Sequence, residues 1–175
     1  MSAGRKSQLI LLVGGAASGK SEVALALAGK ARRRAFVATG QARDGEMKQR
    51  ISRHQAIRPS DWETAEVPKD LEGWMRCTSN KYQIVVIDCL TLWLNNLGTR
   101  VHEALVSKRV DGLLRVIREG SVRVVIVSNE LGMGLVPIGR SARRFRDLAG
   151  KVNQRVAAEA DEVYFVISGQ VLRLK

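Results

Sequence analysis

The sequence has no long hydrophobic run. No apolar stretch among its 175 residues approaches the ~20 residues that a transmembrane helix requires. Positions 1–7 carry charge, but no apolar segment with a cleavage site typical of a signal peptide follows them. We therefore expect a cytoplasmic protein without a membrane span.

Cysteine is also scarce. The two cysteines, Cys77 and Cys89, lie at a spacing that matches no zinc or redox motif. Thiols in a reducing compartment generally stay free. We therefore expect two free thiols without a functional role.

Acidic and aromatic residues are few beside the basic ones. The chain has 29 Lys and Arg against 17 Asp and Glu, a net charge of +12 that would suit a polyanionic partner. Aromatic residues make up 5% of the chain and do not interleave with the basic clusters, as a base-stacking surface would require. We expect no nucleic acid partner and most arginines on solvated helix faces, although a basic nucleic acid binder stays open as an alternative. The clusters lie at 32–34 and at Arg140, Arg143, Arg144 and Arg146.

The most informative local pattern is a phosphate-binding loop, G-x-x-x-x-G-K-[ST], at residues 14–21. An apolar run at 9–13, typical of a buried strand, precedes it, and a predicted helix at 22–31 follows, so the motif has its structural context. In such a loop the backbone N–H groups curl around a phosphate, Lys20 reaches the outer phosphates and Ser21 ligates Mg²⁺. The predicted nucleoside triphosphate site comprises Gly14, Gly15, Ala16, Ala17, Ser18, Gly19, Lys20 and Ser21.

Further apolar runs alternate with helical patterns along the chain. Strands are predicted at 35–38, 84–87, 122–127 and 163–167, with 171–174 as a hairpin partner. Helices are predicted at 45–57, 70–77, 90–97, 101–119 and 141–159. Continuous β-branched runs are typical of strands that are buried on both faces. The sequence therefore predicts one α/β domain, residues 1–175, with a mostly parallel sheet, helices on both faces and a C-terminal antiparallel hairpin.

Polar residues follow two of these predicted strands. Asp88 comes directly after 84–87, where a carboxylate beside the phosphate loop can hold Mg²⁺; the alternative is an N-cap of the following helix. The strand at 122–127 leads into Ser128, Asn129 and Glu130. Ligands in open α/β sheets collect at the carboxyl ends of strands. Glu130 is therefore a candidate to orient or deprotonate an acceptor hydroxyl, or a structural turn residue.

His54 stands between two arginines on a predicted helix. Helical spacing puts Arg50, His54 and Arg58 on one stripe. Spacing alone is compatible with a packed or surface histidine as well as with a catalytic one.

Further segments with distinctive residues lie at 44–47, 62–66, 127–137 and 144–154. Two stretches within them, N-E-x-G-M-G and R-D-x-A-G-x-x-N-Q, are far more specific than the phosphate loop, which many families share. Through these residues the chain resembles the bifunctional adenosylcobinamide kinase / adenosylcobinamide-phosphate guanylyltransferase family of cobalamin biosynthesis. The resemblance implies a P-loop, RecA-like fold and a homotrimer.

The resemblance also implies two successive transfers. ATP or GTP would first phosphorylate a hydroxyl of adenosylcobinamide, and GMP from GTP would then join that phosphate to give adenosylcobinamide-GDP. His54 would carry GMP as a covalent intermediate, with Lys20 as the second catalytic residue. A plain P-loop kinase of a small hydroxyl substrate, with a structural His54, remains the alternative. The nucleotide site would further include Thr39, Gly40, Arg58, Glu66 and Asp88, and Mg²⁺ would lie at Ser21 and Asp88.

Overall fold

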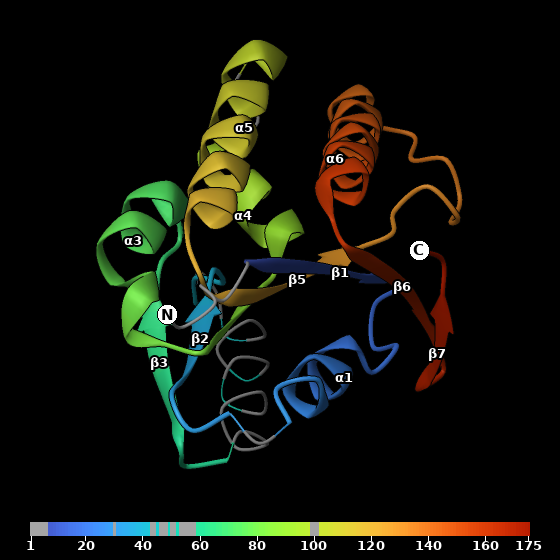
Figure 1. The fold of residues 1–175 in the computed structure, drawn as a ribbon. Coiled ribbons are helices and arrows are strands. Elements are labelled where there is room, and N and C mark those ends of the chain that lie inside the picture. The colour runs from blue at the N-terminus through green and yellow to red at the C-terminus, as the bar shows by residue number, and fades with distance from the viewer. Residues whose placement is uncertain are drawn as a thin grey trace.

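The computed structural model describes residues 7–29, 31–42, 45, 49, 52, 59–98 and 102–175. Within these residues seven strands form one sheet in the order β3-β2-β4-β5-β1-β6-β7 (Figure 1). The strands are β1 (Gln8–Gly14), β2 (Arg34–Ala38), β3 (Trp62–Glu66), β4 (Ile84–Asp88), β5 (Arg123–Asn129), β6 (Glu162–Ile167) and β7 (Gln170–Arg173). Every neighbouring pair is parallel except β6 and β7, which are antiparallel. The predicted sheet with its C-terminal hairpin is confirmed.

Helices cover both faces of the sheet, as predicted (Figure 1). Strand alternation divides the apolar residues into two clusters, so that Leu9 and Leu11 face one way and Ile10 and Leu12 the other. The first cluster packs against α3, α4, α5 and α6, and the second packs against α1. The helices are α1 (Lys20–Ala26), α3 (Leu71–Thr78), α4 (Leu90–Leu97), α5 (Glu103–Glu119) and α6 (Arg140–Glu159), with a 3₁₀ turn η1 (Ser79–Lys81). Among the described residues, no helix is both long enough and apolar enough to span a membrane.

Strand β3 was not among the strands predicted from apolar runs. Of its five residues only Trp62 is buried, because β3 lies at the edge of the sheet. Pairing with β2 defines this strand: Trp62 lies opposite Arg34 in the ladder and contacts Phe36 edge to face, with ring centroids 6.4 Å apart. The pattern of alternating burial is too weak to predict β3 from the sequence.

Two predicted helices need comment. The helix predicted at 22–31 begins earlier, at Lys20, because the phosphate loop leads directly into it, and it ends at Ala26, before Gly29 with φ +55°. The helix predicted at 45–57 lies outside the described residues except for positions 45, 49 and 52. His54 and Arg58 therefore also lie outside them.

The parallel register brings the carboxyl ends of six strands, β1 to β6, to one edge of the sheet. Gly14 of β1 lies opposite Asn129 of β5, and Asp88 of β4 lies opposite both Val127 and Ala38. Ala38 in turn lies opposite Glu66. Crevices at this edge of open α/β sheets hold ligands, so the candidate site is built here.

Candidate nucleotide-binding site

The phosphate loop turns tightly between β1 and α1. A Cβ atom on Gly14 would lie 2.3 Å from the backbone oxygen of Val166, so β6 leaves no room for a side chain there. Gly19, the N-cap of α1, has φ +93°, a conformation that glycine adopts without strain. The loop thereby delivers its backbone to the N-terminus of α1, where N–H groups favour an anion.

Lys20 lies beneath this loop. Its side chain is only 7% exposed, and its Nζ donates to the backbone oxygen of Gly14 at 3.0 Å and to Ser18 Oγ at 3.3 Å. It also donates to the backbone oxygen of Gly15. The loop thus holds a positive charge at the place where the motif predicts phosphates.

Ser21 and Asp88 meet although they come from different elements. Ser21 Oγ donates to Asp88 Oδ2 at 2.8 Å. The N-cap of α4 is Cys89, whose Sγ accepts from the backbone N–H of Leu92, so Asp88 does not have the alternative capping role. The structure brings together the two predicted metal ligands.

The chemistry of this pair suits Mg²⁺. Mg²⁺ prefers hard oxygen ligands and commonly uses one or two side chains together with substrate phosphates and water. In the part of the chain that the structure describes, no three His, Cys, Asp or Glu residues form a group able to hold a metal ion. Ser21 and Asp88 thus offer a two-ligand site of the kind that phosphate oxygens complete.

Thr39 lies beside Asp88 but turns its hydroxyl into the protein. It is fully buried, and its Oγ1 accepts from the backbone N–H of Cys89 at 2.8 Å and donates to the backbone oxygen of Cys89 at 2.7 Å. The backbone N–H of Thr39 donates to the backbone oxygen of Asp88 at 3.0 Å. Thr39 therefore braces the chain that carries Asp88. Gly40 follows it half-buried, and Glu66 is exposed at the end of β3, with β2 between it and Asp88.

Both cysteines are free thiols, as predicted, and only Cys77 is exposed. Burial, and then the charge of Asp88, raise the pKa of Cys89 to about 11. Cys89 consequently remains protonated beside the site.

Glu130 has a local structural role. Its Oε1 accepts from the backbone N–H of Gly132 at 2.6 Å, and its own N–H donates to the Gly14 oxygen at 2.9 Å. The first bond shapes the turn after β5, and the second ties this turn to the phosphate loop. Close by, the buried side chains of Thr91, Ser128 and Asn153 meet from three elements, a grouping that sequence reasoning missed.

The segment between β5 and α6 exposes large apolar side chains. Arg143 supports this segment, because its Nη1 donates to the Pro137 oxygen at 2.9 Å. The exposed residues are Met133 (77%), Leu135 (97%), Val136 (64%) and Ile138 (99%). Exposed apolar side chains gathered in one segment are typical of surfaces that meet a partner or a ligand.

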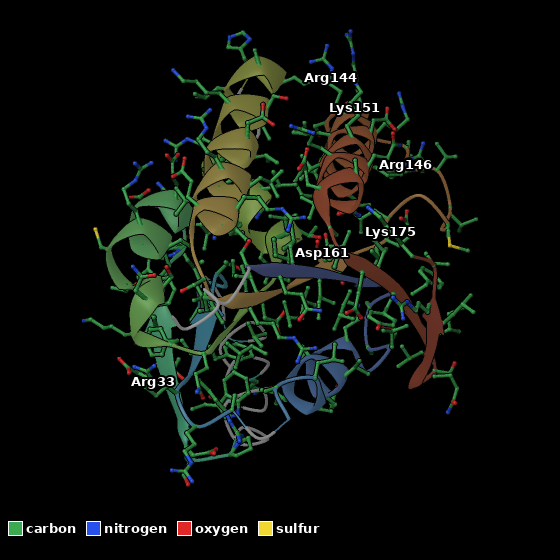
Figure 2. The ribbon with its side chains drawn as sticks, viewed as in Figure 1. Arg33, Arg144, Arg146, Lys151, Asp161 and Lys175 are labelled. Atoms are coloured by element: carbon green, nitrogen blue, oxygen red, sulfur yellow. The ribbon has the colours of Figure 1, made fainter. Side chains whose placement is uncertain are left out.

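The basic clusters are separate. Figure 2 shows Arg144, Arg146 and Lys151 on α6, and Arg33 on the far side of the molecule. Several basic groups are paired with acids, such as Lys151 with Glu103 at 2.7 Å and Arg34 with Asp61 at 3.2 Å. The charge is therefore spread over distant surfaces.

A parallel sheet, a phosphate loop with a buried lysine, and a Ser–Asp pair on adjacent elements define a P-loop nucleotide-binding protein of RecA-like fold. Solved structures support this fold. The RadB recombinase is 17% identical with a TM-score of 0.52, covering 92% of this chain and 74% of its own. A KaiC-like protein from Pyrococcus horikoshii is 12% identical with a TM-score of 0.52, covering 97% and 79%.

The sequence model of the cobinamide kinase / cobinamide phosphate guanyltransferase family matches residues 10–174. The chain belongs to this family, whose members are kinase and guanylyltransferase enzymes.

Curated relatives agree with this assignment. The bifunctional adenosylcobalamin biosynthesis protein CobU of Escherichia coli (strain K12) is 37% identical over 95% of this chain and 99% of its own length. The bifunctional adenosylcobalamin biosynthesis protein CobP of Pseudomonas aeruginosa is 39% identical over 94% and 96%.

Proposed function

We propose that this chain, as one P-loop domain, phosphorylates adenosylcobinamide and then transfers GMP from GTP to adenosylcobinamide phosphate in cobalamin biosynthesis. The family match over residues 10–174 supports the pair of reactions. The observation that most directly supports nucleotide chemistry at the loop is the 2.8 Å bond between Ser21 and Asp88, next to the buried Lys20.

The triphosphate binds along residues 14–21, with its phosphates at the N-terminus of α1. Ser21 and Asp88 are the residues that would hold Mg²⁺, which would offset phosphate charge when bound. The resemblance to the family adds three residues to the nucleotide site: Gly40, Glu66 and Arg58. Thr39 supports Asp88 through its hydrogen bonds to the backbone at Asp88 and Cys89.

The kinase step requires positioning and charge compensation. The substrate hydroxyl oxygen attacks the γ-phosphorus of ATP or GTP and releases its proton to solvent, while the bond to the β-phosphate oxygen breaks and the nucleoside diphosphate leaves. Lys20 exchanges its bonds to the loop carbonyls for bonds to the phosphates. Its ammonium offsets the charge that develops on the departing diphosphate.

The guanylyl step uses His54. A neutral imidazole nitrogen attacks the α-phosphorus of GTP and pyrophosphate leaves. A phosphate oxygen of adenosylcobinamide phosphate then attacks the same phosphorus, which breaks the N–P bond and frees the histidine. Arg50 and Arg58, four positions before and after His54 in the sequence, help to keep it neutral through their positive charge.

Labelled GTP tests the histidine intermediate. Incubation with GTP labelled at the α-phosphate and Mg²⁺ should leave label on the protein that is acid-labile and alkali-stable. His54→Ala should abolish this label. The chain's other histidine, His102, is exposed just before α5, so His102→Ala is the matched control and should be labelled like the unmodified protein. Equal labelling of His54→Ala would disprove the intermediate.

The same samples decide between the proposed function and a plain P-loop kinase. A kinase of a small hydroxyl substrate would transfer the γ-phosphate but take up no α-label, and His54→Ala would keep its activity. The proposed enzyme should transfer both the γ-phosphate and the α-labelled GMP. It should form adenosylcobinamide phosphate with γ-labelled ATP or GTP and adenosylcobinamide-GDP with α-labelled GTP.

We also infer a homotrimer, which the family resemblance implies. The exposed Leu135 and Ile138 support a contact between subunits, because burial of such side chains favours association. Light scattering should give three times the chain mass, and Leu135→Asp with Ile138→Asp should lower it. Leu105→Asp, at a 47% exposed leucine of α5, is the control. An unchanged trimer in the double variant would exclude this segment from the contact.

We infer finally that the protein acts in the cytoplasm, where its nucleotide substrates are found, and that nucleic acid is not a partner. A filter-binding titration with duplex DNA should show binding at low salt at most, which disappears as the salt concentration rises. Affinity that persists at physiological salt would contradict this inference.

A further inference from the structure

Asn129, the last residue of β5, is held on both sides by buried side chains. Its backbone N–H donates to Thr91 Oγ1 at 2.9 Å, and its backbone oxygen accepts from Asn153 Nδ2 at 3.1 Å. Ser128 Oγ donates to Asn153 Oδ1 at 2.6 Å and lies 3.3 Å from Thr91 Oγ1. These contacts close a ring through α4, β5 and α6.

The donors of this ring leave one arrangement of protons. Since Ser128 gives its only proton to Asn153 Oδ1, Thr91 must be the donor of the bond between the two hydroxyls. Thr91, Ser128 and Asn153 are 6%, 1% and 7% exposed, so each missing bond would leave a buried polar group unsatisfied. The ring is thus a rigid support for the peptide groups on either side of Asn129.

The side chain of Asn129 faces the phosphate loop. Side chains alternate along a strand, and Val125 and Val127 of β5 pack in the cluster on the α1 face. Ser128 points to the opposite face, toward α6. Asn129 therefore points to the α1 face, where the Asp88 side chain meets Ser21.

The strand that carries Asn129 lies between two strands that end in residues of the proposed phosphate site. β5 lies between β4, which ends at Asp88, and β1, which ends at Gly14, the register partner of Asn129. The Asn129 side chain is half-buried, and no described residue hydrogen-bonds its carboxamide. A neutral donor thus stands between the loop and the candidate metal ligands.

We propose that the carboxamide N–H of Asn129 donates a hydrogen bond to the terminal phosphate of the bound triphosphate, and that Thr91, Ser128 and Asn153 are positioning residues for it. The proposal rests on the proposed nucleotide site at residues 14–21. Because Glu130 N–H also bonds to the Gly14 oxygen, one turn fixes Asn129 and the start of the loop relative to each other. Asn129 would then distinguish a triphosphate from a diphosphate, since a diphosphate lacks the phosphate that it contacts.

Affinities for tri- and diphosphates test this contact. Calorimetry should measure the dissociation constants of a non-hydrolysable ATP analogue and of ADP, both with Mg²⁺, for the unmodified protein and for Asn129→Asp. The substitution keeps the shape but replaces the donor with a negative charge. We expect the analogue to bind about tenfold more weakly and ADP to change less than about twofold. Asn129→Ala should also weaken the analogue more than ADP, but by a smaller factor. This variant replaces Asn129→Asp in the test if the Asp variant does not fold.

Asn80→Asp is the matched control. Asn80 is exposed in η1, at the amino end of β4 and away from the loop, so this variant should bind both nucleotides normally. Equal weakening of the analogue and ADP in Asn129→Asp, or no weakening of either, would overturn the contact. Failure of the unmodified protein to bind either nucleotide would overturn the proposed function as well.

Asn153→Asp tests the support. Its Oδ1 can still accept from Ser128, but it no longer donates to the Asn129 oxygen. A positioning role predicts the same selective loss for the triphosphate, smaller than in Asn129→Asp, in a protein that remains folded by circular dichroism. Equal losses for both nucleotides would show that Asn153 has only a structural role.

Discussion

Substitution of Gly14 tests the packing of the phosphate loop, and the same substitution at the neighbouring Gly15 is its control. A Cβ atom on Gly14 would lie 2.3 Å from the backbone oxygen of Val166 and 2.9 Å from Ser18 Oγ. Val166 is fully buried and paired with Gly14 in the β1–β6 ladder, so its carbonyl has little room to move. A Cβ atom on Gly15 would meet nothing within 4 Å.

The expected magnitude follows from the cost of overpacking. Forcing a methyl group into a packed interior costs about 1–3 kcal/mol of unfolding free energy. For a chain of this size, each 1 kcal/mol lowers Tm by about 2–4 °C. Gly14→Ala should therefore lower Tm by roughly 2–12 °C. Gly15→Ala should leave it unchanged or raise it slightly, because alanine reduces the entropy of the unfolded chain.

Thermal denaturation followed by circular dichroism, without nucleotide, measures both variants under the same conditions. Binding of ATP provides a second measurement, since the clash should displace the loop in Gly14→Ala and weaken binding even below its Tm. Equal melting temperatures for the two variants would refute the packing argument. A normal Tm with lost binding would mean that the loop, and not β6, yields to the new methyl group.

Three further predictions concern the site and its surroundings. Asp88→Asn keeps the shape of the side chain but removes its charge, so we expect a folded protein whose ATP binding no longer strengthens on titration with Mg²⁺; an unchanged Mg²⁺ dependence would exclude Asp88 as a ligand. Because Cys77 is exposed and the pKa of buried Cys89 is raised to about 11, a disulfide reagent at neutral pH should modify one thiol in the native protein and two after denaturation; rapid reaction of both thiols in the native state would contradict the burial of Cys89. Burial tends to raise the pKa of Asp161, but hydrogen bonds from Arg118 and the Leu9 N–H outweigh it, so the net pKa is lowered. Its stabilising effect is therefore complete above the pKa of the unfolded chain and is lost as the pH falls through the lower folded value, below about pH 4; acid titrations of stability should be less steep for Asp161→Asn, and parallel curves would disprove the linkage.

Much of the fold was predictable because its signals are local. The continuous apolar runs of β1, β4 and β5 predicted strands that are buried on both faces, and the structure confirms their parallel pairing. Helix α4 occupies Leu90–Leu97, the range that the sequence predicts. The edge strand β3 was missed because its burial comes from pairing with β2 and not from its own composition.

In the candidate site, too, the residues close together in the sequence were predictable and the contacts between distant residues were not. The loop, Asp88 and the family motifs are visible as consecutive residues, but the sequence could not distinguish a capping Asp88 from one that meets Ser21. That contact joins residues 67 positions apart, and the ring around Asn129 joins Ser128 to residues 37 and 25 positions away. Glu130 attracted attention from its position after a strand, whereas the structure places its carboxylate in a turn and Asn129 toward the loop.

The sequence by itself determined the fold class, the phosphate loop and the family, because local backbone preferences, apolar periodicity and motif chemistry are written in neighbouring residues. Only the tertiary structure decided that Ser21 donates to Asp88 and that the Thr39 hydroxyl bonds to the backbone of Cys89. It also decided that side chains from other elements hydrogen-bond the backbone of Asn129. The physical reason is that hydrogen bonds between elements depend on sheet order and register. Those two properties arise only when the whole core packs.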